Sequence, residues 1–174
     1  KFILGGLRSW YIRGQAPAFA EGEISPEMFE AVRSRAPASP LDFQERLLAV
    51  HHFMSLDAAS SLAAANKRIA NLLKKTKETS TSVVNEALFD IQEEKGLHTA
   101  VTALLPDHQA ALAKRDYASV FRRLAELREP IDNYFDQVMV LTDDEKLRAN
   151  RLAQLGQLRE LFLDIADISG IPTT

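Results

Sequence analysis

The sequence contains no cysteine, and none of its 174 residues belong to an apolar run long enough to span a membrane. Without thiols, disulfides, thiolate catalysis and cysteine-ligated zinc are excluded. A membrane helix needs about 18 consecutive apolar residues, and the N-terminal stretch lacks the pattern of a secretory signal. We therefore expect a cytoplasmic protein with no membrane partner. The chain begins with Lys1 rather than Met, which is consistent with a piece of a longer polypeptide.

Motifs for catalysis and metal binding are also scarce. The four histidines lie at positions 51, 52, 98 and 108. None of them has metal-ligand spacing to another, so we expect exposed or core-edge histidines. Gly5-Gly6 lacks the strand, further glycines and lysine of a phosphate-binding loop. Residues 126–145 hold seven acids and one arginine, which is typical of a solvated face. We expect no catalytic residue, nucleotide site or metal site here.

Apolar residues recur at helical spacing along the first half of the chain. Ser25-Pro26 and Ser39-Pro40 each offer an N-cap followed by the residue best tolerated in a first helical turn. They predict helices over residues 26–35 and from 40 to about 54. A third stripe predicts a helix over 58–75 that buries Leu62, Ala65, Ile69 and Leu72. The polar residues 76–82 predict a loop.

The second half predicts further helices and no paired strands. A helical region runs over 83–114, where Pro106 should produce a kink or an interruption. Asp116 caps the next helix, and Pro130 kinks that helix or begins another. Thr142 to Glu145 fits a capping box before a long final helix. Val138 to Leu141 is the one run with strand character, and nothing offers it a partner. The fold class that follows is an all-α helical bundle.

The charge of the chain is unevenly distributed. Residues 66–77 carry five cations and no acid, in a chain of net charge -3, so the remainder carries -8. Lys67, Asn71 and Lys74 share one side of the predicted helix. Lysines near a helix C-terminus interact favourably with the helix dipole, and charged runs often do no more than keep a surface solvated. The asymmetry equally suits a polyanion that docks in one orientation.

Several separated motifs resemble one family, in the correct order. They are SPLDFQERLLAV, LAAANKRIANLLKK, REPIDNYFDQVMVLTDDEKLRANRLAQL and LRELFLDIADIS. Over about 41–169 the chain resembles the C-terminal part of the bacterial glycyl-tRNA synthetase β subunit, with weaker similarity in LRSWYIRG. That region is similar to the anticodon-binding domain of arginyl-tRNA synthetases, a class Ia helical bundle. The resemblance implies an N-terminal helical extension or linker over 1–38 and an anticodon-binding helical domain over 39–174.

The resemblance also implies partners and chemistry. The full enzyme would be an α₂β₂ assembly that ligates glycine to tRNA(Gly), with ATP and magnesium on the α subunit. We expect no cofactor and no catalysis in this chain, and no DNA partner. In the basic helix, Lys67, Lys74 and Lys75 are candidates for phosphate contacts. The candidates for hydrogen bonds to anticodon bases are Asn66, Arg68 and Asn71.

Other residues leave alternatives open. Some of Arg148, Asn150 and Arg151 are expected to close the same RNA surface. Equally, Arg151 could pair with acids of the 126–145 stretch and Asn150 could join an internal hydrogen-bond network. Tyr134 and Phe135 could stack on bases, but we assign this pair to the core.

A second class of function also remains open. The chain could be a helical interaction module that docks another subunit through the acidic 126–145 surface. Two departures from the family pattern, residues 15–22 and the tail 170–174, are expected to lie away from the RNA face.

Overall fold

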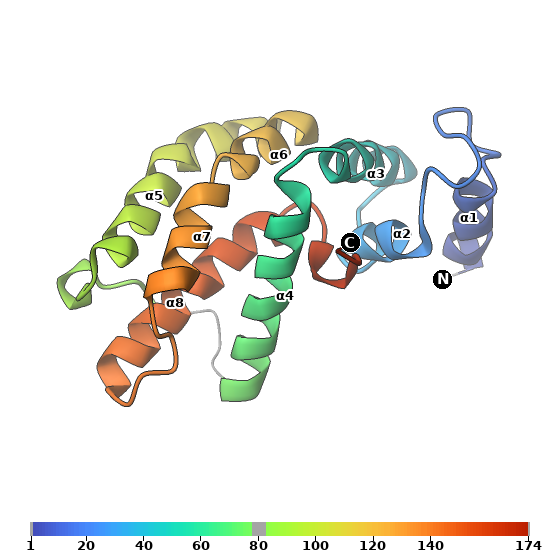
Figure 1. Cartoon of the computed structure of the whole chain (residues 1–174). Coiled ribbons are helices and arrows are strands. Elements are labelled where there is room, and N and C mark those ends of the chain that lie inside the picture. Colours follow the sequence, from blue (N-terminus) through green and yellow to red (C-terminus); the bar gives the residue numbers. More distant parts are fainter. Residues whose placement is uncertain (1, 78–82, 174) are drawn as a thin grey trace.

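The computed structural model describes residues 2–77 and 83–173, with side chains from residue 6 onward (Figure 1). Over those residues the chain is helical, with no strand, which confirms the all-α prediction. The α-helices are α1 (Phe2–Ile12), α2 (Pro26–Arg33), α3 (Pro40–Met54), α4 (Ala59–Thr76), α5 (Gln92–Ala113), α6 (Tyr117–Ala125), α7 (Arg128–Gln137) and α8 (Glu145–Leu163). Two short 3-10 helices, η1 (Glu86–Leu88) and η2 (Ile168–Gly170), complete the described chain.

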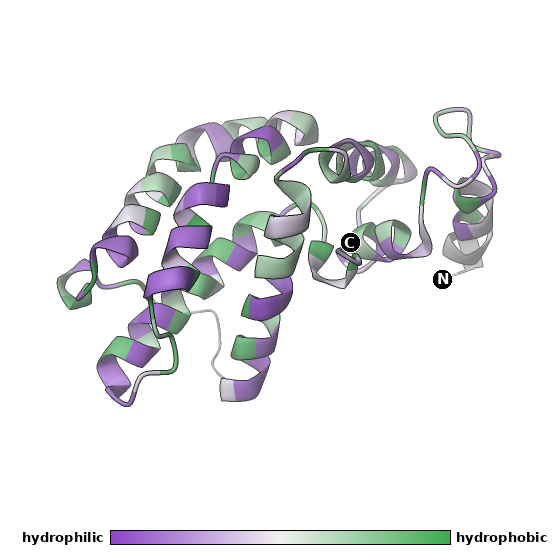
Figure 2. Ribbon diagram, in the orientation of Figure 1, coloured by the Kyte–Doolittle hydropathy of each residue, from purple (hydrophilic) through white to green (hydrophobic). Residues whose placement is uncertain are grey.

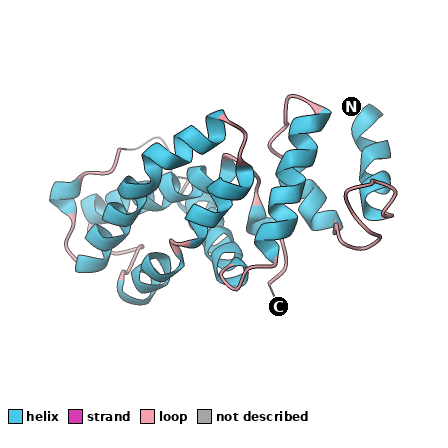
Figure 3. Cartoon of the chain, turned by 90° about the horizontal axis from the view of Figure 1, so that it is seen from above, coloured by secondary structure: helices cyan, strands magenta, loops and turns pink. Residues whose placement is uncertain are grey.

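Helix α8 is the centre of the bundle. It packs against α4, α5, α6 and η1, and seven consecutive residues from Asn150 to Gly156 are buried. Figure 1 shows α4, α5 and α7 around it, whereas α1, α2 and α3 lie toward the other end of the molecule. Figure 3 shows from above that the N-terminal helix lies at that end. A helix enclosed in this way must satisfy its polar side chains internally.

Three of the predicted helix starts are confirmed. Ser25 Oγ accepts a hydrogen bond from the Met28 amide at 3.1 Å, and Ser39 Oγ accepts one from the Asp42 amide at 3.1 Å. Asp116 caps α6 in the same way. Each cap satisfies a backbone donor that the first helical turn leaves free.

The start of α8 was predicted two residues too early. Asp144, not Thr142, is the N-cap, because its carboxylate accepts from the Lys146 and Leu147 amides at 3.0 and 3.1 Å. The Thr142 carbonyl instead accepts a hydrogen bond from Arg148. A charged oxygen next to the helix also interacts better with its N-terminal dipole than a hydroxyl does.

The region 83–114 is not one helix. Residues 83–91 form an extended stretch and the η1 turn, and α5 begins at Gln92. Asn85 stabilises this break, because its side chain caps η1 by accepting from the Ala87 amide at 3.0 Å. Pro106 does not interrupt α5. The turns on either side of it are held by the buried side chains of Leu104 and His108.

The N-terminal region packs on the rest of the chain through α2. The rings of Phe29 in α2 and Phe43 in α3 lie 5.0 Å apart. The Asp167 amide donates to the Ala31 carbonyl at 2.8 Å, which joins α2 to the segment after α8. The proposed boundary at residue 39 stays a prediction.

Two other predicted segments have different outcomes. Residues 78–82 of the predicted loop lie outside the described residues. Residues 138–141 form no strand, although Val138 and Val140 are buried while Met139 and Leu141 are exposed.

Candidate nucleic-acid interface

Helix α4 has one buried face and one exposed basic face. Leu62 and Ile69 are fully buried on the first, and Figure 2 shows hydrophobic and hydrophilic bands alternating along the helix. The residues exposed on the second, which we call the basic face, are Lys67, Arg68, Asn71, Lys74 and Lys75. Lys74 and Lys75 lie in the last turn, where they also interact favourably with the helix dipole.

A hollow of about 360 Å³ lies on the basic face. Lys67, Arg68, Asn71 and Lys75 line it, together with Ala64, Leu72 and Thr173. Thr173 belongs to the C-terminal tail, which we expected to lie away from the RNA surface. That expectation was wrong, because η2 and the tail pack along α4. Three cations around one open hollow create a positive potential that attracts an anion.

Arg68 lies where α4 meets α7. Its guanidinium carbon lies 4.3 Å from the centre of the Phe135 ring. Nearby, Ser61 Oγ donates to Asp132 at 2.8 Å and joins the same two helices. The assignment of Phe135 to the core is correct only in part, because the ring also contributes to this surface. The half-buried ring packs against the core from one side, whereas Tyr134 is a fully buried core residue, as predicted.

Asn66 is not on the basic face. Its side chain is buried, and its Nδ2 donates to the Leu62 carbonyl at 2.9 Å within α4. The expectation that it reads a base is therefore corrected, because a base cannot reach an amide inside the helix packing. The five positions from Asn66 to Asn71 correspond to a rotation of about 140° around the helix axis, which explains why two similar residues lie on different faces.

Arg151 is also an internal residue. Its Nε donates to Glu94 Oε1 at 2.8 Å, and its side chain is 4% exposed against 1% for Glu94. A second nitrogen donates to the Met139 carbonyl at 2.8 Å. Of the two alternatives left open for Arg151, the structural one holds, but the partner is Glu94 of α5 rather than an acid of residues 126–145. Arg151 is accordingly removed from the candidate RNA contacts.

Asn150 pairs with the backbone of Asn85. Its Oδ1 accepts from the Asn85 amide at 2.8 Å, and its Nδ2 donates to the Asn85 carbonyl at 3.0 Å. This internal network is the alternative left open by the sequence. Half-buried Arg148 donates to the Thr142 carbonyl at 2.9 Å. Asn150 and Arg151 thus serve the fold, because their side chains are buried and hydrogen-bonded inside it. Arg148 holds the segment before α8 with one of its donors and stays a candidate RNA contact.

Glu94 is the centre of this buried network. Its second carboxylate oxygen accepts from the Asp90 and Ile91 amides at 2.8 and 2.9 Å. Burial alone would raise the pKa of Glu94, but the hydrogen bonds from Arg151 and from the two amides outweigh burial and hold that pKa below its ordinary value. Burial and the Glu94 charge raise the pKa of Tyr134, which therefore stays neutral.

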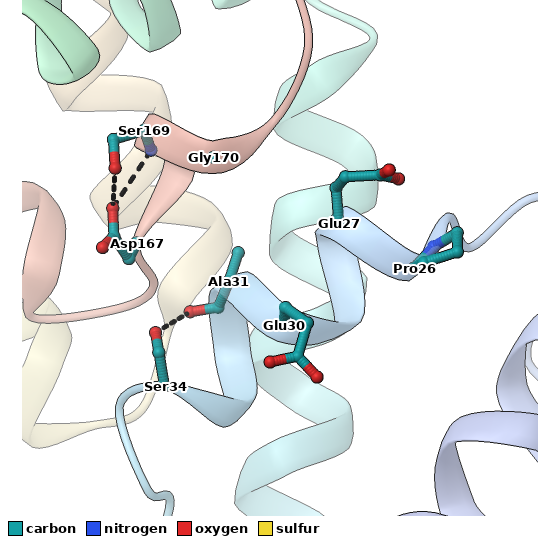
Figure 4. A pocket seen from close by; sticks show the side chains of 8 residues that line it. All are labelled: Pro26, Glu27, Glu30, Ala31, Ser34, Asp167, Ser169 and Gly170. Carbon is teal, nitrogen blue, oxygen red and sulfur yellow. Dashed lines mark hydrogen bonds between the residues drawn. The ribbon is translucent and has the colours of Figure 1, made fainter.

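The remaining hollows have a different character. One of about 350 Å³ lies between α2 and η2 (Figure 4). Three acidic residues line it: Glu30, which pairs with Arg33, Asp167, which pairs with Arg159, and exposed Glu27. Acidic walls repel phosphates, so this hollow does not fit a nucleic acid.

The histidines form no metal cluster among the described residues. His108 is buried rather than at the core edge, with Nε2 2.9 Å from Asp164. His98 lies 2.7 Å from Glu86. No helix in the described part of the chain has the length and apolar character needed to cross a membrane.

The acidic surface lies mainly along α7. Glu126, Glu129 and Asp136 are exposed there. Glu126 and Glu129 line a hollow of about 510 Å³ together with Glu93 of α5. The acidic surface and the basic face therefore occupy neighbouring helices, separated by the contact between Arg68 and Phe135.

Known proteins resemble this chain over nearly its whole length. The glycine–tRNA ligase beta subunit of Actinobacillus succinogenes is 46% identical over 168 residues, which cover 97% of this chain and 23% of that protein. The beta subunit of Aliivibrio fischeri is 46% identical and that of Aeromonas hydrophila 47% identical, each with the same coverage. The chain thus spans 23% of the length of these relatives.

A family of domains matches the part of the chain that holds the basic face. Residues 62–174 match the DALR anticodon binding domain, a region that begins in the first turn of α4 and includes α7 and α8. The match covers more than half of the chain, and it confirms the resemblance inferred from the motifs. The chain belongs to the DALR anticodon binding domain family.

Proposed function

We propose that this chain binds the anticodon arm of tRNA(Gly) in the cytoplasm, as part of a glycine–tRNA ligase beta subunit. The observation that carries the proposal is the acid-free, exposed basic face of α4, which lies inside the match to an anticodon-binding family. The similarity to beta subunits of glycine–tRNA ligase supports the choice of tRNA. A positive face on a chain of net charge -3 also favours one docking orientation.

The exposed residues divide into two tasks. Lys67, Lys74 and Lys75 neutralise phosphates and set the position of the stem-loop, because ammonium groups contact phosphates without reading sequence. Arg68 and Asn71 present planar donors that can reach the edges of unstacked bases. Of the two asparagines of α4, Asn66 is buried and Asn71 is exposed.

The chemistry of aminoacylation is assigned to other parts of the enzyme. We place glycine activation, ATP and magnesium on the α subunit, which is the partner that the name of the relatives implies. The isolated chain is then expected to show no glycine-dependent ATP–pyrophosphate exchange. Exchange by the pure chain would contradict this assignment.

A low-salt titration tests the RNA-binding proposal. Wild-type protein is titrated with tRNA(Gly) and with the same tRNA carrying a changed anticodon, at several salt concentrations. Replacing Lys67, Lys74 and Lys75 with alanine is expected to weaken binding to both. It should also reduce the log–log salt slope by about 0.7 to 0.9 for each phosphate that the protein no longer neutralises.

A matched control variant removes the same charge elsewhere. Lys95, Lys114 and Arg122 are exposed on α5, α6 and the turn between them. Their replacement with alanine changes the net charge equally and should leave most of the salt slope intact. Equal affinity of the wild type for both tRNAs, or equal losses in the two triple variants, would reject the proposal.

The acidic surface supports a second candidate function, the docking of the α subunit. Glu126, Glu129 and Asp136 are exposed along α7, and Met139, which is 70% exposed, follows the end of that helix. An apolar side chain beside acids suits a protein partner with a basic rim. Pull-down of the α subunit by the wild type, and its loss when the three acids are neutralised, would support this role. Unchanged capture would exclude the acidic surface as the docking site.

A further inference from the structure

The contact between Arg68 and Phe135 has a counterpart elsewhere in the molecule. Arg46 of α3 lies over the Tyr117 ring at 4.6 Å, a spacing close to the 4.3 Å at Arg68. Arg46 also donates to Asp42 at 2.9 Å and to the carbonyls of Asp164 and Ile165 at 2.8 and 2.9 Å. The donors of Arg46 are therefore used by the fold, and its role is structural.

Arg68 makes none of these additional contacts with the described residues. No carboxylate of the described chain lies within ion-pair distance of it, and no carbonyl there accepts a hydrogen bond from it, although its side chain is exposed. Asp132, the acid of α7 that contacts α4, accepts from Ser61 and lies 3.8 Å from Arg128. The Arg68 guanidinium is thus held against a ring while its hydrogen-bond donors face solvent.

A guanidinium held in this way is a prepared surface for a nucleobase. It is planar and weakly hydrated, and it stacks on aromatic faces as well as donating in its own plane. Unpaired bases stack on arginine planes and aromatic rings in many RNA-binding proteins. The Phe135 ring restricts the side chain before binding, so less conformational freedom is lost when a base arrives.

We propose that Arg68 and Phe135 form a stacking site for one unpaired base of the anticodon loop. Arg68 contacts the base, and Phe135 is a positioning residue that holds the guanidinium from beneath. This inference rests on the proposed function, since it names the part of the RNA that reaches the boundary between α4 and α7. The lysines of the basic face lie on the same helix and would hold the neighbouring phosphates.

The experiment uses the whole chain and an anticodon stem-loop of tRNA(Gly) with 2-aminopurine placed at each loop position in turn. Stacking changes the fluorescence of this base analogue. In the wild type, one position is expected to respond on binding. Arg68→Lys keeps the charge but removes the planar group, and it should abolish that response and weaken binding about 5- to 150-fold.

Phe135 is tested by two replacements. Phe135→Leu keeps an apolar side chain without the ring, and it should weaken the fluorescence response. Phe135→Tyr keeps the ring, and it should retain that response. In the Arg68→Lys background, Phe135→Leu should have little further effect on binding, because the two residues act as one unit. All titrations are made well below the melting temperature of each variant.

The outcomes separate the stacking site from RNA binding itself. No binding of the stem-loop by the wild type would reject the proposed function. Binding that depends on the lysines but is equal in Arg68→Lys would overturn the stacking site alone and make Arg68 a phosphate contact. The stacking site would also be overturned if Phe135→Tyr lost the fluorescence response to the same extent as Phe135→Leu. Arg46→Lys is the control, and it should alter stability without changing the fluorescence response.

Discussion

Two arginines of this chain show how the same chemical group is used in opposite ways. Arg151 lies in the interior of the bundle, where Glu94 and the Met139 carbonyl accept from it. Arg68 lies on the outside of α4 against one aromatic ring. The interior arginine joins segments that are distant in sequence, whereas the exposed one keeps its donors for another molecule. Burial, more than residue type, decides which arginine belongs to the fold and which to the interface.

The difference originates in the surroundings of the two helices. Helix α4 faces solvent on one side, and its charged residues all lie on that exposed side. Helix α8 is enclosed, so Asn150, Arg151 and Gln154 are buried at consecutive turns. The Gln154 amide nitrogen donates to the Glu94 carbonyl at 2.7 Å, whereas its side-chain oxygen has no hydrogen-bond partner among the described residues. A buried polar group without a partner is unfavourable, so the partners of Asn150 and Arg151 stabilise the fold.

The largest expected effect comes from breaking the interior pair. Arg151→Ala leaves the Glu94 carboxylate buried and without its cation, which should lower the free energy of unfolding by about 3 to 5 kcal/mol. Arg68→Ala removes one exposed cation–π contact and should lower it by about 0.5 to 1 kcal/mol. Urea denaturation of both variants measures the difference. Similar losses of unfolding free energy in the two variants would contradict the contrast between an interior and an exposed arginine.

Asn150→Ala should have the next largest effect. The change removes both hydrogen bonds to the Asn85 backbone, and at about 0.5 to 1.5 kcal/mol for each bond the free energy of unfolding should fall by about 1 to 3 kcal/mol. Amide hydrogen exchange gives a local measurement, because the Asn85 amide should lose protection in the variant. Retained protection at Asn85 together with weakened tRNA binding would instead return Asn150 to the RNA surface.

Local signals in the sequence were sufficient for much of the fold. Ser25, Ser39 and Asp116 each mark a helix start that needs only a side chain and an amide a few residues later. The apolar stripe of α4 likewise predicts which side is buried. These features depend on neighbours in the chain, and so they can be read from one sequence.

The features that could not be predicted depend on distant partners. Glu94 and Arg151 are 57 residues apart, and Asn85 and Asn150 are 65 apart. The spacing of apolar residues in α8 does not indicate that other helices enclose it. The contact between Phe135 and Arg68 could not be predicted for the same reason, because it exists only once α4 and α7 pack together.

The pH dependence of stability should reflect Glu94. Its pKa in the folded chain is held below the ordinary value of 4.5. The unfolded chain therefore takes up the proton first as the pH falls, so the contribution of Glu94 to stability is complete above about pH 4.5 and is lost as the pH falls toward the folded pKa. Glu94→Gln should reduce the pH dependence of the free energy of unfolding in this range. Urea denaturation between about pH 3 and pH 6 measures it. An unchanged slope in the variant would show that other carboxylates control acid unfolding.

The smallest effect is expected on the basic face itself. Lys67 is exposed in the middle of α4, so Lys67→Ala should change the free energy of unfolding by no more than about 0.5 kcal/mol, because alanine is also the better helix former. Lys74→Ala should cost about 0.3 to 1 kcal/mol at low salt, since Lys74 interacts with the C-terminal helix dipole, and added salt should reduce that loss. Thermal unfolding at two salt concentrations measures both changes. A large, salt-independent loss in Lys67→Ala would mean that this lysine stabilises the bundle, and the contrast between a structural interior and a free basic face would no longer hold.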